Sequence, residues 1–274
     1  MRRVITDFTA TIYGVQESKI KTANGLVDTY EEVLMPINAL QQTILLQLRV
    51  QEARLKSVLN AMGFLSAYDY VVAFNSGVNN GYHSTAHCLG VAHTALEIFP
   101  SEFLSNEEQT GILLAAVFHD FGHTAANVPD LQNIELAVAG LKGYRASLTE
   151  PTGIAWANFD LVFQIAEDCI RITEYPFVKE PRGQCEQIIR DADMLYACTN
   201  IDTVSVIEGL REELEDKLDK KISLDEMVES QSRFLEGAKF YTPTGQALFK
   251  AAKGPSLNML RAYVADQNKQ ASQR

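Results

Sequence analysis

All five histidines of this 274-residue chain lie between positions 83 and 123. His83 and His87 are four residues apart, and an α-helix places such a pair of side chains on one face. The same spacing separates His119 from His123, and Asp120 directly follows His119. Imidazole nitrogens and carboxylate oxygens are ligands for divalent metals. The cluster therefore predicts a site for one or two metal ions.

A carboxylate from a distant part of the chain is expected to complete this site. The segment Arg190-Asp191-Ala192-Asp193-Met194-Leu195 contains two aspartates. We take Asp193 as the ligand, and Asp191 is the alternative.

The segment before His119 is continuously apolar from Ile112 to Phe118, which predicts a buried helix. Ser105 is expected to begin it, with Glu107 and Glu108 in the first turn, where acidic side chains suit the helix dipole. A buried helix that ends in a His-Asp pair needs a compensating charge, and a cation supplies one.

The rest of the chain shows helical periodicity and no convincing series of strands. Apolar positions recur at helical spacing from Val27 to Met62, with Pro36 expected to kink or divide the helix. This segment is either a dimerisation helix or a scaffold helix. Further helices are expected at about 157–172, 184–200, 208–220, 224–240 and 244–267. We therefore predict an all-α fold and a single domain over 1–274, with an N-terminal arm and scaffold helices in 1–54 and a motif-bearing core in 55–250.

Composition limits the possible partners. The net charge of −11 disfavours binding to a polynucleotide backbone. The four cysteines form no disulfide framework, and no stretch approaches the ~18 apolar residues of a membrane span. We expect a cytoplasmic protein that binds a small molecule and neither a membrane nor a polynucleotide.

Five short motifs follow one another along the chain: Tyr82-His83-Ser84-Thr85-Ala86-His87, His119-Asp120-Phe121-Gly122-His123 with Asn127 following, Glu135-Leu136-Ala137, Ala192-Asp193-Met194, and Ser230-Gln231-Ser232-Arg233-Phe234-Leu235. Their order resembles that of the HD-domain metal phosphohydrolases. Within that superfamily the chain most resembles the catalytic domain of the class I 3′,5′-cyclic nucleotide phosphodiesterases, over about residues 55 to 250.

The chain also departs from that family's pattern. Ser84 replaces the asparagine of the first motif, and Thr124-Ala125 replaces a Pro-Gly pair. The Glu-Asn-His-His segment that usually follows Glu-Leu-Ala is missing. Tyr196 stands where many members have asparagine, so base preference cannot be transferred.

The resemblance implies a two-metal site. His87, His119, Asp120 and Asp193 would hold the first ion, which we expect to be Zn, Mn or Fe, and Asp120 would bridge to a second, Mg or Mn. A hydroxide between the metals would attack phosphorus, and His83 would act as general acid toward the leaving O3′.

The remaining residues of the resemblance have less direct roles. His123 and Glu135 would lie behind the ligands or order water on the second ion. Gln231 and Phe234 would bind the purine, and Tyr82 would line the pocket. His93 is expected to be structural.

The function implied is metal-dependent hydrolysis of a 3′,5′-cyclic nucleotide, cAMP or cGMP, to the 5′-monophosphate. The alternatives are an HD-type phosphohydrolase acting on a (d)NMP, dNTP, (p)ppGpp or cyclic dinucleotide, and a non-catalytic HD module that senses a nucleotide. A homodimer is possible.

Overall fold

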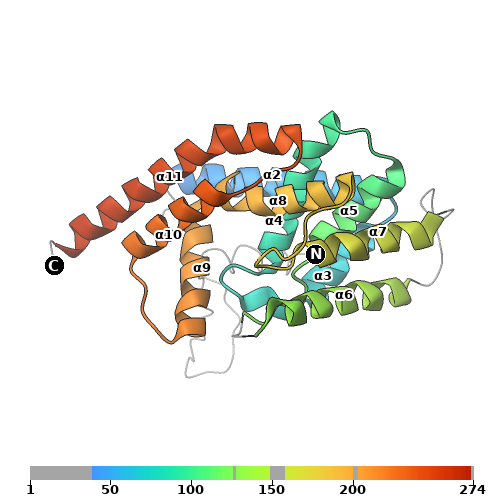
Figure 1. The fold of residues 1–274 in the computed structure, drawn as a ribbon, viewed down its shortest axis with the longest axis horizontal. Helices are drawn as coiled ribbons and strands as arrows, with labels where there is room; N and C mark the ends of the chain where they lie inside the picture. Colours follow the sequence, from blue (N-terminus) through green and yellow to red (C-terminus); the bar gives the residue numbers. More distant parts are fainter. Residues whose placement is uncertain (1–38, 126–127, 149–157, 200–202, 273–274) are drawn as a thin grey trace, which may run out of the picture. The chain divides into compact units, whose positions relative to one another are not determined.

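The fold is helical throughout the part of the chain that the structure describes, which confirms the all-α prediction. The computed structural model describes residues 39–125, 128–148, 158–199 and 203–272 (Figure 1). Its α-helices are α2 (Ala39–Ala61), α3 (Leu65–Phe74), α4 (Thr85–Ile98), α5 (Asn106–Phe118), α6 (Asp130–Ser147), α7 (Phe159–Ile172), α8 (Gln184–Thr199), α9 (Thr203–Leu218), α10 (Leu224–Gly237) and α11 (Pro243–Ala271), with short 3-10 helices η1 (Ser76–Asn79) and η2 (Phe99–Ser101).

The chain divides into two compact units, Met1–Val50 and Gln51–Arg274. The described part of the first unit is the beginning of α2, so the predicted arm and the kink at Pro36 lie outside the described residues. The second unit contains all ten candidate site residues. The single domain stays a prediction.

α5 is the central helix of the second unit and packs against α3, α4, α6, α7 and α8. Ser105 caps its N-terminus through a reciprocal pair of hydrogen bonds with Glu108, at the predicted start. Every side chain from Ile112 to Phe118 is fully buried, and each large one contributes about 1.5–3 kcal/mol of burial free energy. This burial fixes where the helix ends, and therefore where His119 lies.

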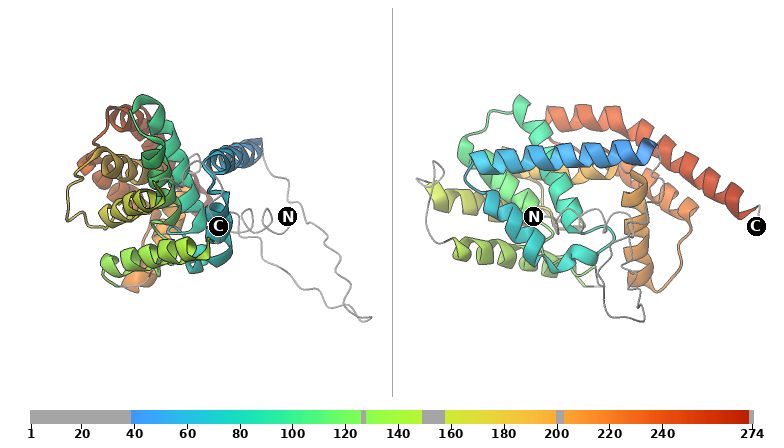
Figure 2. Two further views of the ribbon diagram at one scale, coloured as in Figure 1. Left: turned by 90° about the vertical axis from the view of Figure 1, so that its right-hand side faces the viewer. Right: turned by 180° about the vertical axis from the view of Figure 1, so that it is seen from behind.

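α7 and α8 are the two helices that connect α5 to the other helices of this unit. α6 and α7 run alongside each other and α7 packs closely on α5, as Figures 1 and 2 show. α8 contacts α7 and also α4, α5, α9 and α11, and α9 runs transverse to α8 and α11 (Figure 1). A smaller apolar cluster joins α9, α10 and α11 through Ile207, Met227, Val228, Leu260 and Val264. Among the described helices, none has the length and hydrophobicity needed to cross a bilayer.

Each histidine pair would share a face only if both of its residues lay within one helix, and the structure shows that neither pair does. α4 begins at Thr85 after the N-cap residue Ser84, so His83 precedes the helix. α5 ends at Phe118, and the chain then turns through Gly122, whose positive φ of 75° is a conformation that glycine adopts without strain. Neither pair therefore shares one helical face.

Candidate metal centre

Four donor atoms from three helical segments converge at the centre of the second unit. His87 comes from α4, His119 and Asp120 from the C-terminal end of α5, and Asp193 from α8. His87 Nε2 lies 3.1 Å from His119 Nε2, 3.2 Å from Asp120 Oδ2 and 3.3 Å from Asp193 Oδ1. His119 Nε2 lies 3.2 Å and 3.6 Å from the same two carboxylate oxygens.

These separations fit a shared metal ion. With metal–ligand bonds of about 2.0–2.1 Å, the ligand atoms of a tetrahedral site lie about 3.3–3.4 Å apart. His87, His119 and Asp120 form a buried group that can hold a metal ion. Asp193 is partly exposed, and its distances to both histidines make it the fourth member. The prediction of a metal site is thus supported, while the identity and number of the ions stay predictions.

Hydrogen bonding at His119 orients a lone pair toward this point. The Ala116 carbonyl oxygen lies 2.9 Å from Nδ1 and can only accept, so Nδ1 carries the proton. Nε2 then presents its lone pair to the other donor atoms, which is the usual arrangement behind a metal-binding histidine.

The charges of the group depend on each other. Burial opposes a positive charge on His119, but Asp120 and Asp193 outweigh it and raise the pKa of His119 well above its usual value. Burial alone would also raise the pKa of Asp120, yet His119 and His87 hold that pKa well below normal. The site therefore favours ionised carboxylates and positive charge between them, which a divalent cation provides.

The structure distinguishes between the two candidate aspartates of α8. Asp193 lies beside the histidines. Asp191 is fully buried and accepts hydrogen bonds from the backbone N–H groups of Tyr241 and Thr242 and from the Thr242 hydroxyl, at 2.8–3.2 Å. Asp191 thus holds the segment that leads into α11 and is not a ligand.

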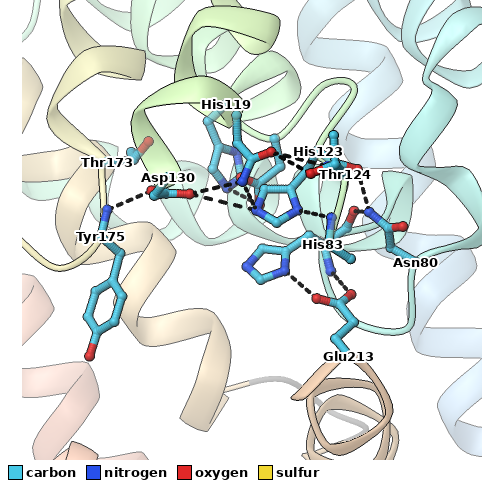
Figure 3. A network of polar contacts seen from close by, with 12 residues as sticks. Asn80, His83, His119, His123, Thr124, Asp130, Thr173, Tyr175 and Glu213 are labelled. Carbon is cyan, nitrogen blue, oxygen red and sulfur yellow. Dashed lines mark hydrogen bonds and ion pairs between the residues drawn. The ribbon is translucent and has the colours of Figure 1, made fainter. Parts of the chain in front are cut away.

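His83 lies beside the donor group and is held by a residue of α9. Its Nδ1 is 2.6 Å from Glu213 Oε2, and Glu213 Oε1 accepts the backbone N–H groups of Tyr82 and His83 at 2.6 and 2.8 Å (Figure 3). Burial lowers the pKa of His83, but the hydrogen bond to Glu213 and the nearby carboxylates raise it overall. The ring stays partly exposed, at 28% of its side chain.

His123 stacks on His83, with ring centroids 3.9 Å apart and planes 16° from parallel. Its Nδ1 accepts the Ala125 backbone N–H at 3.0 Å, and its Nε2 lies 3.0 Å from the Asn133 side-chain amide and 3.7 Å from Asp130 Oδ1. Figure 3 shows this network of α6 around the ring. Both ring nitrogens are thus engaged by protein groups, which suits a residue behind the ligands.

Glu135 does not join the site, contrary to the prediction. Its side chain is 55% exposed and pairs with Arg171 Nη1 at 2.5 Å. Asn133 already directs its side chain to His123, and residues two apart on a helix differ by about 200° in direction, so Glu135 faces away.

The proposed base-binding pair has other contacts. Gln231 is buried and its amide donates to the Ala197 carbonyl oxygen at 3.3 Å. Phe234 is partly buried, with its ring edge-on to Tyr175 at 6.3 Å. Tyr82 packs its ring on His87, with centroids 4.7 Å apart, so it lies at the metal group as expected of a lining residue. His93 contacts Glu97 and not the group, as expected.

Two asparagines also hold the site together. The buried Asn75 side chain accepts the N–H groups of Gly77 and Gly122 at 3.0 and 2.8 Å and donates to Thr85. Asn80 donates to the carbonyl oxygens of His83 and His123. These bonds fix the loop before α4 against the turn after α5. Asn127 of the second motif lies outside the described residues.

The most important residue that sequence reasoning missed is Glu213. In the sequence it is one of many charged residues of the helix expected at about 208–220. A signal did exist, because Glu213 lies seven residues after Val206 and four after Gly209, on the face of α9 that is buried. A carboxylate on an otherwise apolar face indicates a specific partner.

No known family model matches this sequence, and no curated protein is significantly similar to it.

Proposed function

We propose that this protein is a metal-dependent phosphohydrolase. One observation carries the proposal: the four donor atoms of His87, His119, Asp120 and Asp193 converge beside His83, an imidazole whose Nδ1 is held by a carboxylate. A cation site next to an oriented proton donor is the combination that phosphoester hydrolysis requires.

The four ligands would hold a divalent cation, which supplies positive charge to phosphoryl oxygens and lowers the pKa of a water molecule toward neutrality. The protein does the rest. The Ala116 carbonyl keeps His119 in the tautomer that binds through Nε2, and α5 keeps its position by burial.

His83 is the proposed general acid. Glu213 accepts a hydrogen bond from Nδ1, which directs Nε2 away from the carboxylate and leaves that nitrogen to donate a proton to a leaving oxygen. Stacking on His123 fixes the plane of the ring. The partial exposure of His83 allows a substrate to reach it.

The proposed substrate is a 3′,5′-cyclic nucleotide, with the 5′-monophosphate as product. This choice is supported by the order of the motifs and by the need of the O3′ alkoxide for a proton, which His83 would supply. A second ion, which Asp120 would also help to hold, belongs to the same proposal. The engagement of Gln231 by Ala197 and the position of Glu135 do not add support, so other nucleotides remain in the test.

The test is incubation of the purified chain with Mg²⁺ or Mn²⁺ and cAMP, cGMP, cyclic dinucleotides, dGTP, (p)ppGpp and 5′-monophosphates, with chromatographic separation of the products. We expect conversion of a cyclic mononucleotide to its 5′-monophosphate, lost in His119→Ala and retained in the matched histidine variant His93→Ala. Hydrolysis of a different nucleotide would support the assignment as a phosphohydrolase and contradict the proposed substrate. If the metal-bound protein is inactive on every compound, the proposal that it is an enzyme of this class is contradicted.

A further inference from the structure

The loop between α7 and α8 carries an aromatic side chain that none of the motifs includes. Its residue Tyr175 donates its backbone N–H to Asp130 Oδ2 at 2.7 Å. Asp130 in turn lies beside His123, which stacks on His83. The loop is therefore tied by a short series of contacts to the imidazole proposed as the general acid.

A buried arginine side chain also packs against this loop. Arg190 is almost fully buried, and its guanidinium carbon lies 3.6 Å from the centroid of the Phe177 ring. The same guanidinium donates to the carbonyl oxygens of Ile172 and Lys179, one at each side of the aromatic residues. A planar cation on an aromatic face together with two hydrogen bonds stabilises the conformation of this loop.

The Tyr175 side chain is exposed, although two aromatic neighbours contact its ring. Its ring contacts Phe177 edge-on at 5.2 Å and Phe234 edge-on at 6.3 Å, so both neighbours touch it without stacking on it. The residue is 54% exposed. In the view of Figure 3 the Tyr175 ring lies on the same side of the line from Asp130 to His123 as the His83 ring.

We infer that Tyr175 is the surface on which the nucleobase of the substrate stacks, with Phe177 and Phe234 as its supports. A fixed aromatic ring with an accessible face binds flat heteroaromatic groups and loses little conformational freedom in doing so. This inference rests on the proposed function for the nucleotide, and it assigns a base contact that the sequence motifs do not contain.

The contact of Gln231 agrees with recognition of the base by stacking. The Gln231 amide donates to the Ala197 carbonyl oxygen inside the protein. Stacking on Tyr175 needs no hydrogen-bond readout, so the contact should accept adenine and guanine alike.

The test measures binding and not turnover. Affinities of adenosine 5′-monophosphate, guanosine 5′-monophosphate and ribose 5-phosphate are determined by titration calorimetry in Mn²⁺ buffer for the wild-type chain and for Tyr175→Ala, Tyr175→Leu and Tyr175→Phe. Phe103→Ala is the matched control, because Phe103 is a fully exposed aromatic residue before α5. Melting temperatures are recorded for all variants.

We expect Tyr175→Ala and Tyr175→Leu to weaken both nucleoside monophosphates about tenfold and ribose 5-phosphate by less than about twofold, with Tyr175→Phe and Phe103→Ala near wild type. Tyr175→Leu keeps an apolar side chain against Phe177 and Phe234, so it remains informative if the alanine variant unfolds.

Equal loss for ribose 5-phosphate, or no loss for the nucleotides, would overturn the inference. Nucleotides that bind the wild type no better than ribose 5-phosphate would overturn it as well. A base-dependent loss of affinity in a chain that hydrolyses none of the nucleotides would support the stacking surface while the proposed enzyme fails.

Discussion

Glu213 of α9 holds His83 with both of its carboxylate oxygens, one on the imidazole Nδ1 at 2.6 Å and the other on the backbone N–H at 2.8 Å. The Glu213 side chain is buried. Burial alone would raise the pKa of Glu213, but the bonds from His83 and Tyr82 lower it overall, so the residue is ionised. The imidazole is therefore fixed in both position and tautomer by a helix far from it in the sequence.

Replacement of Glu213 should damage proton transfer and spare the metal. We expect Glu213→Gln to lower kcat about tenfold to a hundredfold for an alkoxide leaving group, because His83 is no longer oriented. An ester with a p-nitrophenolate leaving group, which needs no proton, should lose much less. Glu212→Gln is the matched control, since Glu212 is the exposed neighbour. Equal losses on both esters would contradict the role of His83 as general acid.

Metal binding should stabilise the fold through the histidines of α4 and α5. Because the donor atoms exist together only in the folded chain, Mn²⁺ at about one hundred times its dissociation constant should add about 2.7 kcal/mol to the free energy of unfolding. The stabilisation should vanish in His87→Ala and His119→Ala and persist in His93→Ala. Thermal unfolding with and without chelator, together with elemental analysis, measures it. If His119→Ala binds as much metal as the wild-type chain, the proposed metal site is contradicted.

Replacement of Asp193 should affect metal binding, whereas replacement of Asp191 should affect the stability of the fold. Asp193→Asn should lose the metal and activity while the melting temperature without metal stays close to wild type. Asp191→Asn should destabilise by about 1–3 kcal/mol, because an amide N–H then faces the donors of Tyr241 and Thr242. Denaturant unfolding and metal titration on both variants check this. Metal loss in Asp191→Asn at temperatures where this variant is folded would contradict the assignment of Asp193, and not Asp191, as the ligand.

A close backbone contact should control the position of Glu213. A Cβ on Gly209 would overlap the carbonyl oxygen of Gly81, so α9 packs directly on the loop that leads to His83. Gly209→Ala should destabilise by about 1–3 kcal/mol and reduce turnover with metal affinity retained. Gly254→Ala is the control, because a Cβ there meets nothing within 4 Å and alanine favours the interior of α11. Wild-type stability and turnover of Gly209→Ala would refute this coupling.

The local elements could be predicted from the sequence because local signals determine them. The continuous apolar run from Ile112 to Phe118 and the Ser105–Glu108 cap place α5, and the histidine and aspartate at its end follow by covalent connection. The residue types of the metal group were visible for the same reason. Side-chain chemistry needs no structure to be recognised.

Tertiary structure decided which of these residues meet. The Ala192-Asp193-Met194 motif favours Asp193 over Asp191 in the sequence, and the packing of α8 against α4 and α11 shows why: it directs Asp193 to the histidines and Asp191 to Thr242. The family motif misled for Glu135, because Asn133 and not Glu135 lies on the face of α6 that is directed to His123. Glu213 reaches His83 because Gly81 and Gly209 allow two backbones to touch. Such contacts depend on burial and direction in three dimensions, which no local pattern in the chain specifies.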